Sequence, residues 1–469
     1  MKKLVLFLLA GCLLAACGKE AATPCVVAHR GYWKAEGAAQ NSIASLLAAG
    51  RIGAYGSEFD VNLTGDGRLV VNHDFTYHGL TIAETDFNTL RDTSLRLKNG
   101  EIIPTLDEYL AASKQYPKMK LVFELKSKGD PDYEAKALPA CVEAIRRHGV
   151  AKRVEFISFS LSACQEFARL MPKNRVEYLG GEIAPAELHE MGITGIDYHY
   201  SVFNNHPEWV REAHNLGMVV NAWTVDKPED IIHMLQLGVD HITTNEPELV
   251  QRLIAEGKYC LTPEDREKNV VLETTLGTIE LKLYDSTPLH RDNFRALVKE
   301  EAYDSLLFHR VIRDFMIQGG DPDSKRAEPG VLLGEGDRNY TVPAEFRLED
   351  GIFHRRGVLA AAREGDDVNP QQRSSAMQFY IVWGRVFDEE GLDKVQTRLD
   401  ARTDGRVKLT PEMREVYKTV GGTPHLDGQY TVFGEVVSGL DVVDAIQQVA
   451  TDENDRPLSD VRILRAFLK

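Results

Sequence analysis

The chain has 469 residues, which is more than one ordinary domain holds, so we expect two or more domains. Its formal net charge of −16 argues against general nucleic-acid binding, because that function needs a basic face. The composition is that of a globular protein without low-complexity tracts, and its acidity is compatible with a site that binds a divalent cation.

The first residues have the pattern of a bacterial lipoprotein signal peptide. Two lysines precede an apolar run that is too short to span a membrane comfortably, and the polar sequence GKE follows. The segment LAAC at residues 14–17 resembles the bacterial lipobox, in which cleavage precedes a cysteine that is then lipidated. We therefore expect removal of residues 1–16, lipid on Cys17, and a short tether at 17–24. The protein would then lie outside the cytoplasm, on the periplasmic or surface side of a cell-envelope membrane. The alternative is an ordinary secretory signal with a chance cysteine.

Short apolar runs alternate with helical segments between residues 25 and 255. The first of these runs is VVAHR and the last is HITT, with amphipathic segments such as NSIASLLAAGRIG between them. This strand–helix alternation predicts a parallel sheet closed as a (β/α)8 TIM barrel. The number of strand-like runs is one more than a barrel needs, so we expect one excursion near the second and third strands.

The pattern changes after residue 255. Residues 256–268 are polar and irregular, and we expect a linker there. Residues 269–469 contain short strands in which apolar and polar residues alternate, which predicts an all-β closed barrel with flanking helices. A charged segment at about 386–421 has helical composition and is expected to be a surface insertion.

Carboxylates follow the expected strands of the first domain at the ends where a barrel carries its catalytic groups. Residues two apart on a strand share a face, so Glu58 and Asp60 converge, and Glu124 can join them from another strand. Three carboxylates repel each other unless a cation lies among them. Ligation by oxygen alone favours Mg²⁺ or Ca²⁺.

The other polar side chains at these strand ends suit a phosphate substrate. Arg30 and Lys126 are suited to bind phosphate oxygens. His29 and His73 are suited to act as general base and general acid. Together with the metal, these residues predict metal-assisted phosphoryl transfer.

The first domain resembles the glycerophosphodiester phosphodiesterases over about residues 25–255. The motifs that carry the resemblance are AHRG, SEFDV, VVNHD, VFELK, NAWTVD and GVDHITTNEP. The family cleaves deacylated phospholipids to sn-glycerol 3-phosphate and an alcohol, by attack of the substrate's own glycerol hydroxyl. The resemblance implies that Glu58, Asp60 and Glu124 bind the metal and that His29 and His73 are the base and the acid. It also implies that Arg30 and Lys126 bind the phosphate and that Trp223 lines the glycerol side of the pocket.

Two positions depart from the pattern of that family. Gln40 stands where the family commonly has a glutamate, while Asn41 is kept, and a later threonine–aspartate is Thr244-Asn245 here. The neutral amide of Gln40 removes one negative charge near the site, which bears on the metal and on the substrate. Neither change removes a predicted acid, base or metal ligand, so we expect an active enzyme.

The stretch FHRVIRDFMIQGGD, residues 308–321, is the densest signal in the second half of the chain. It places an arginine beside bulky apolar and aromatic residues, with no carboxylate–histidine set nearby. That combination suits a pocket that holds a ring and hydrogen-bonds an amide, rather than hydrolysis. With TPLHRDNFRALV, GVLAAA, MQFYIVW and HLDGQYTVFGEVV, the stretch resembles the cyclophilin-type peptidyl-prolyl isomerases over about residues 268–468.

The resemblance implies that Arg310 stabilises the twisted amide of an X–Pro bond, whose rotation barrier is about 18–20 kcal/mol. No cofactor is needed for this reaction. His425 stands in place of a tryptophan familiar from eukaryotic members, and Arg363 in place of a common asparagine. The resemblance further implies that Phe315, Met316 and Tyr380 line the proline pocket and that Gln318, Ala362 and Gln378 position the peptide backbone. Leu426 would complete the apolar wall, and Tyr430 stands where a histidine is often found.

The sequence therefore predicts a bifunctional lipoprotein with phosphodiesterase and isomerase activity. Its expected partners are glycerophosphodiesters, proline-containing peptides or unfolded proteins, and a membrane through the lipid on Cys17, but no nucleic acid. One alternative is a folding factor or peptide-binding protein whose barrel is a degenerate binding module. Another is a diesterase that acts on a different phosphodiester.

Overall fold

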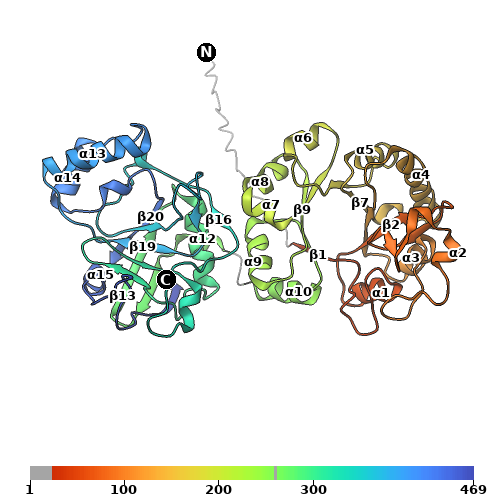
Figure 1. Cartoon of the computed structure of the whole chain (residues 1–469), viewed down its shortest axis with the longest axis horizontal. Helices are drawn as coiled ribbons and strands as arrows, with labels where there is room; N and C mark the ends of the chain where they lie inside the picture. The colour runs from red at the N-terminus through yellow and green to blue at the C-terminus, as the bar shows by residue number, and fades with distance from the viewer. Residues whose placement is uncertain (1–23, 258–260) are drawn as a thin grey trace, which may run out of the picture.

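The computed structural model describes residues 24–257 and 261–469, which form two domains that lie side by side (Figure 1). The expected signal peptide and Cys17 lie outside the described residues. Within the described part, no helix combines the length and apolar character needed to cross a membrane. The described cysteines, Cys25, Cys141 and Cys164, are not joined in disulfides.

Eight parallel strands form the first domain and close into a barrel, because β1 pairs with both β2 and β11. The excursion is β3 (Leu69–Val71), which runs antiparallel to β2. The TIM-barrel prediction is therefore confirmed. The barrel strands are β1 (Cys25–Ala28), β2 (Gly56–Leu63), β6 (Lys120–Leu125), β7 (Val154–Ser158), β8 (Val176–Tyr178), β9 (Gly195–His199), β10 (Val219–Trp223) and β11 (His241–Thr244).

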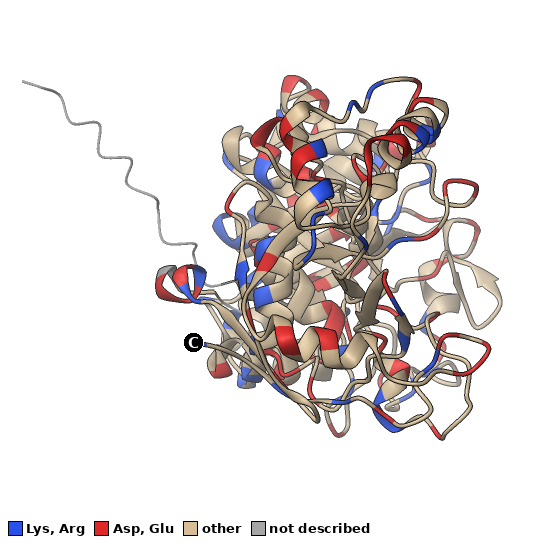
Figure 2. Ribbon diagram, turned by 90° about the vertical axis from the view of Figure 1, so that its left-hand side faces the viewer, with Lys and Arg blue, Asp and Glu red and all other residues tan. Residues whose placement is uncertain are grey.

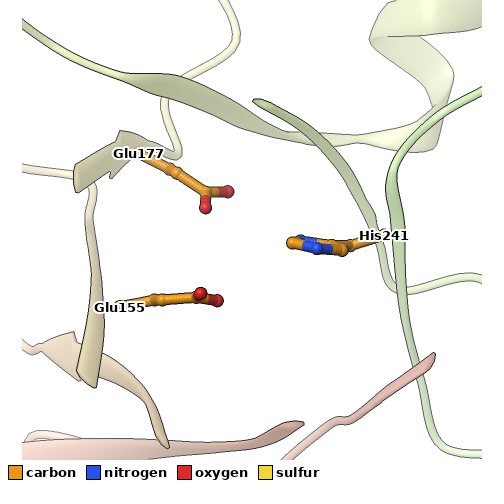
Figure 3. A group of neighbouring side chains, drawn as sticks. All are labelled: Glu155, Glu177 and His241. Carbon is orange, nitrogen blue, oxygen red and sulfur yellow. The ribbon is translucent and has the colours of Figure 1, made fainter. Parts of the chain in front are cut away.

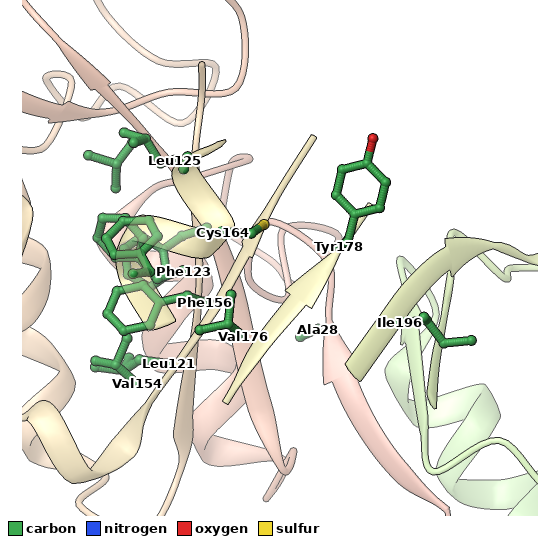
Figure 4. Close-up of a cluster of buried hydrophobic side chains, with 14 of the residues drawn as sticks. Ala28, Leu121, Phe123, Leu125, Val154, Phe156, Cys164, Val176, Tyr178 and Ile196 are labelled. Carbon is green, nitrogen blue, oxygen red and sulfur yellow. The ribbon is translucent and has the colours of Figure 1, made fainter. Parts of the chain in front are cut away.

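Helices surround the barrel, and local signals set their ends. The side chain of Asp130 caps the start of α4 by accepting from the main-chain nitrogens of Asp132 and Tyr133, and Gly149, at φ 70°, ends it. The outward faces of the strands pack against these helices (Figure 4), as where Phe156 stacks on Phe167 at 4.1 Å. The helices are α1 (Ile43–Arg51), α2 (Phe87–Leu90), α3 (Leu106–Ala112), α4 (Pro131–His148), α5 (Leu161–Leu170), α6 (Pro185–Glu190), α7 (Tyr200–Asn205), α8 (Glu208–Asn215), α9 (Pro228–Leu237) and α10 (Pro247–Glu256).

The inward faces of the strands fill the barrel in layers. Strand alternation places every second residue inside, and the middle layer combines an apolar cluster with the buried polar side chains of Asp197, Asn221 and Thr243 on β9, β10 and β11. Charged side chains lie on both sides of it along the strands: Glu124 follows Val122 on β6, whereas Glu155 precedes Ile157 on β7. The apolar cluster of this layer contains Val27, Val122, Ile157 and Leu179.

The second domain is an antiparallel sheet of eight strands in the order β14-β15-β19-β17-β20-β13-β12-β21. Main-chain hydrogen bonds from Ser305 to Ile463 (2.8 Å) and from Phe308 to Val461 (2.9 Å) join the segments beside its two edge strands. The expected closed β domain with helices is confirmed. Its elements are β12 (Val270–Thr274), β13 (Gly277–Leu283), β14 (Arg310–Ile312), β15 (Met316–Gly319), β17 (Val358–Ala361), β19 (Phe379–Val382), β20 (Val432–Ser438), β21 (Ile463–Leu468), α12 (Pro288–Lys299) and α15 (Leu440–Gln447).

Two segments between these elements are helical. The expected linker contains α11 (Pro263–Glu267), because Thr262 and Asp265 each accept a hydrogen bond from the other's main chain in a capping box. The prediction that this stretch is irregular is wrong for those residues. The predicted helical segment at 386–421 contains α13 (Glu389–Thr403) and α14 (Pro411–Thr419), which lie at the outer end of the second domain in Figure 1.

Acidic and basic residues are interspersed over the face of the molecule shown in Figure 2. Neither sign gathers there into one broad patch.

Candidate active sites

Three predicted metal ligands meet at the carboxyl end of the first barrel. Glu58, Asp60 and Glu124 each offer an oxygen within 4.8 Å of the others, and all three are buried. Oε1 of Glu58 makes no hydrogen bond among the described residues. Asn41 fixes Asp60 by donating to its Oδ2 at 2.8 Å and accepting from its main-chain nitrogen at 3.1 Å.

The three carboxyls of this cluster differ in the direction of their pKa shifts. Burial and repulsion from Asp60 raise the pKa of Glu124 to about 8 and that of Glu58 well above its usual range. Burial acts to raise the pKa of Asp60, but Lys126, His73, Asn41 and Arg30 together outweigh it, and the pKa is lowered. A divalent cation would remove the repulsion, so this oxygen-only donor set fits Mg²⁺ or Ca²⁺.

Lys126 lies on the edge of the carboxylate cluster. Its Nζ is 2.7 Å from Oε1 of Glu124 and 3.5 Å from Oδ1 of Asp60. The ammonium also lies over the ring of Phe159, at 5.9 Å from its centroid. Lys126 can therefore reach a phosphate held at the cluster.

Arg30 follows β1 and turns its main chain sharply toward the cluster. Its φ is 53°, and its main-chain nitrogen donates to Oε2 of Glu58 at 2.6 Å. Its NH1 donates to Oε1 of Gln40 at 3.0 Å, so the amide that replaces the family's glutamate still orients the guanidinium. The next residue must be glycine, because a Cβ on Gly31 would lie 2.3 Å from Oγ of Ser45. Nε of Arg30 is buried without a hydrogen-bond partner among the described residues, as a phosphate-binding group would be.

His29 is oriented by Asn245, a contact between residues far apart in the sequence. The amide of Asn245 can face only one way, since its Oδ1 accepts from the indole of Trp33 at 2.7 Å and its Nδ2 donates to Asp226 at 2.7 Å. Nδ1 of His29, at 2.9 Å from the same Oδ1, must therefore carry the proton. Burial and the charge of Arg30 lower the pKa of His29 to about 4, so Nε2 is free to accept a proton at neutral pH.

His73 and Trp223 lie at the edge of the same site. His73 follows β3, and its Nδ1 is 2.7 Å from Oδ1 of Asp74. With 35% of its side chain exposed, this ring is open to a substrate that enters the site from solvent. Trp223 ends β10, donates to the carbonyl of Asp197 at 2.9 Å and packs edge-on against Phe159 at 5.7 Å. The indole thus forms an apolar wall, and Phe159 is a neighbour that the sequence did not single out.

A pocket on the second domain brings together the residues that the cyclophilin resemblance implied, except Gln378. That side chain lies behind the pocket, where it accepts from Nε2 of Gln318 at 3.0 Å. Arg363, one of the departures, lines the pocket as well. The lining residues are Arg310, Phe315, Met316, Gln318, Ala362, Arg363, Tyr380, Leu426 and Tyr430.

The pocket has a buried apolar floor and a charged rim. Met316 and Tyr380 are almost fully buried in the floor, where they belong to one cluster of apolar side chains. Arg310 is on the rim with 44% of its side chain exposed, and its Nε is 3.4 Å from Oδ2 of Asp455. The guanidinium of Arg363 lies 4.5 Å from the ring centroid of Tyr430 and holds that ring in place.

The sequence does not predict a chain of buried hydrogen bonds that extends from the floor of the pocket. The hydroxyl of Tyr380 is 3.0 Å from Nε2 of His354, and Nδ1 of His354 is 3.0 Å from Oδ1 of Asp427. Oδ2 of Asp427 accepts from Tyr417 at 2.7 Å, which comes from α14 of the inserted segment. The inserted segment is therefore linked by hydrogen bonds, through Asp427 and His354, to Tyr380 in the floor of the pocket. His425, at the position of the absent tryptophan, stacks on Phe315 at 5.6 Å.

Comparisons with known proteins find relatives of both domains. Residues 29–249 match the glycerophosphoryl diester phosphodiesterase family, and residues 269–467 match the cyclophilin type peptidyl-prolyl cis-trans isomerase family. A solved glycerophosphodiester phosphodiesterase from Parabacteroides distasonis is 49% identical, with 50% of this chain and 98% of that chain covered and a TM-score of 0.49. A peptidyl-prolyl cis-trans isomerase-like 1 of Neurospora crassa is 32% identical over 200 residues, which are 42% of this chain and 92% of that protein. The chain belongs to both families.

Each half of the chain thus has its own relatives, and those of the isomerase domain differ in length. A peptidyl-prolyl cis-trans isomerase of Arabidopsis thaliana is 34% identical over 202 residues, but the alignment spans only 24% of that protein. The chain is accordingly an enzyme with a phosphodiesterase domain and an isomerase domain.

In the phosphodiesterase domain, we expect Asn245→Asp to move the acid limb of the pH profile to higher pH. A carboxylate beside Nδ1 favours the imidazolium, so the pKa of His29 rises from about 4. With the neutral ring as the expected base, activity should fall as pH decreases through this pKa and should be lost sooner in the variant. The measurement is kcat/KM against pH, with the exposed Asn215→Asp as the matched control. An unchanged acid limb would separate Asn245 from the charge of His29.

Proposed function

We propose that the first domain hydrolyses glycerophosphodiesters to sn-glycerol 3-phosphate and an alcohol with the help of a divalent cation. The observation that carries this proposal is the buried cluster of Glu58, Asp60 and Glu124, in which one oxygen of Glu58 has no hydrogen-bond donor among the described residues. Arg30 and Lys126 border that cluster and supply the positive charge that a phosphodiester needs.

The side chains divide the chemistry among themselves. Mg²⁺ or Ca²⁺ bound by Glu58, Asp60 and Glu124 would polarise the phosphate. Nε2 of His29 accepts the proton of a glycerol hydroxyl as its oxygen forms a bond to phosphorus, since Nδ1 is committed to Asn245. His73 gives a proton to the alcohol oxygen as its bond to phosphorus breaks. Water then opens the cyclic phosphate, and the products are glycerol 3-phosphate and the alcohol.

Arg30 and Lys126 hold the phosphate during both steps. Their charges lie on opposite sides of Asp60, with Nε of Arg30 at 4.0 Å and Nζ of Lys126 at 3.5 Å from its two oxygens. A bound phosphate would give the buried Nε of Arg30 the partner that it lacks among the described residues.

The test is release of glycerol 3-phosphate from several glycerophosphodiesters with Mg²⁺, with Ca²⁺ and with chelator. We expect release that needs a metal and that Asp60→Asn lowers by roughly 10³-fold or more, because metal binding contributes several kcal/mol to the transition state. Asp132→Asn, on the exposed start of α4, is the matched control. Absence of release with every metal would favour a degenerate binding module, and turnover of other phosphodiesters alone would point to Gln40 as a mark of altered substrate choice.

For the second domain we propose cis–trans isomerisation of X–Pro bonds in peptides or unfolded proteins. The support is an apolar pocket with the guanidinium of Arg310 on its rim, close to Gln318. A donor aimed at the proline nitrogen favours the twisted amide, in which resonance is lost. The apolar floor at Met316 and Tyr380 suits the proline ring.

We also propose that the protein is an extracytoplasmic lipoprotein held on a cell-envelope membrane through Cys17. The support is the sequence alone, in which LAAC follows a short apolar run. Mass spectrometry of the mature amino terminus, from protein isolated with bacterial membranes, tests the proposal. An unmodified Cys17, or cleavage at another site, would refute it.

A further inference from the structure

A second cluster of buried ionisable side chains lies at the amino-terminal end of the barrel. Glu155 on β7, Glu177 on β8 and His241 on β11 point toward one another (Figure 3). Each offers a ligand atom within 4.8 Å of the others, and their exposed fractions are 2%, 2% and 5%. The middle layer of the barrel lies between them and the phosphodiesterase site, and its apolar members are Val27, Val122, Ile157 and Leu179.

The fold keeps space for this cluster. Glu177 pairs in register with Gly195 on β9, and both face the barrel interior. A Cβ on Gly195 would lie 2.7 Å from Cγ of Glu177 and 2.9 Å from the carbonyl oxygen of Val219. Glycine is therefore required for the side chain of Glu177 to reach the centre of the barrel.

The oxygens of Glu155 are used unequally. Its Oε1 accepts from Tyr55 at 2.8 Å and pairs with Lys120 at 3.1 Å and Arg175 at 3.5 Å. Its Oε2 is buried and has no hydrogen-bond partner among the described residues. Three groups thus orient one oxygen, and the other is directed into the cluster.

No hydrogen bond or ion pair of the kind that orients Glu155 is formed by the side chain of Glu177 with the described residues. Its Oε2 is also buried without a hydrogen-bond partner in the described part of the chain. A buried carboxylate without donors is strongly disfavoured, and the two cations beside Glu155 contact that residue rather than Glu177. Burial and the nearby Asp197 and Glu155 raise the pKa of Glu177 well above its usual range. The cluster therefore needs either a proton on Glu177 or a cation between the side chains.

We propose that Glu155, Glu177 and His241 bind a divalent transition-metal ion, with Zn²⁺ as the best match. A set of one imidazole and two carboxylates suits Zn²⁺ better than Mg²⁺ or Ca²⁺, which prefer oxygen alone. Three side-chain ligands leave one position of a tetrahedral Zn²⁺ for water. The donors on Oε1 of Glu155 match the hydrogen bonds that orient carboxylate ligands in metal sites.

Such an ion would join β7, β8 and β11 across the amino-terminal mouth of the barrel. These strands are not all neighbours in the sheet, since β9 and β10 lie between β8 and β11. The middle layer keeps this ion away from the substrate, so its role is to stabilise the barrel. This role is independent of the proposed phosphodiesterase chemistry.

The test uses the full-length protein with Asp60→Asn, which removes a ligand of the other site, and Co²⁺ and Zn²⁺ as probes. We expect about one Co²⁺ per chain, with the visible absorption of a four- or five-coordinate site, displaced by Zn²⁺ but not by Mg²⁺. Adding Glu177→Gln or His241→Asn should abolish binding, whereas the exposed Glu187→Gln should not affect it. Metal content by mass spectrometry gives the stoichiometry.

A milder variant guards against failure to fold. Tyr55→Phe removes one hydrogen bond behind Glu155 and keeps all three ligands, so Zn²⁺ affinity should fall about 10- to 100-fold. No Co²⁺ or Zn²⁺ bound to the Asp60→Asn protein would overturn the proposal, as would binding that survives Glu177→Gln and His241→Asn together. Absence of diesterase activity from the wild-type protein, with this ion bound, would count against the proposed function alone.

Discussion

Replacing His29 by glutamine is expected to lower kcat of the phosphodiesterase by about 10²- to 10⁴-fold, the usual contribution of a general base. Glutamine can keep the contact with Asn245, but it has no nitrogen that accepts a proton at neutral pH. The carboxylates at Glu58, Asp60 and Glu124 are untouched, so affinity for the divalent cation should stay the same. The measurements are steady-state kinetics and metal titration on one preparation.

The matched control is His78→Gln, because that ring is exposed and bonds only to the carbonyl of Arg96 among the described residues. Its kinetics should equal those of the wild-type protein. If His29→Gln retained full kcat, the base would have to be another group, and His73 would be the next to replace. If it instead lost metal affinity, His29 would belong to the metal site.

The catalytic carboxylates could be predicted because strand parity is a local property. Two residues apart on β2, Glu58 and Asp60 face the same side whatever the rest of the chain does. The pairing of β2 with β6 then brings Glu124 directly beside Asp60. The number of strand-like runs also predicts one excursion near the second and third strands, although the sequence alone does not identify β3 as that run.

The orientation of His29 could not be predicted in the same way. It depends on Asn245, 216 residues later, and on Trp33 and Asp226, which fix the amide. Such contacts follow from barrel closure rather than from spacing. The sequence interpretation recorded Asn245 only as a departure from the family pattern.

The amino-terminal cluster was missed for a different reason. Glu155, Glu177 and His241 lie near the starts of their strands, whereas barrels carry their active sites at the strand ends. The same parity rule places all three inside the barrel. The sequence cannot show which carboxylate oxygens accept hydrogen bonds and which do not. That depends on the contacts of Glu155 with Tyr55, Lys120 and Arg175, which only the folded structure brings together.

Replacing Arg310 by alanine is expected to lower kcat/KM for cis–trans isomerisation of a proline peptide by about 10²- to 10³-fold, as for removal of one donor to a transition state. The guanidinium lies on the rim, with its NH1 3.5 Å from Oε1 of Gln318 and its Nε 3.4 Å from Asp455. The apolar floor does not depend on it, so peptide binding should change much less than turnover. The measurement is a coupled isomerisation assay, with binding of the same peptide measured separately.

Two variants make this result specific to the guanidinium. Arg313→Ala removes an exposed arginine three residues away and should leave isomerisation unchanged. Arg310→Lys keeps the charge without the planar fork of donors, so it should recover only part of the lost rate. Binding of the same peptide by the Arg310→Ala preparation reports that the second domain is folded, since the apolar floor at Met316 and Tyr380 is unchanged. Full isomerase activity in Arg310→Ala would contradict the assignment and would leave the pocket as a site that binds proline peptides without accelerating their rotation.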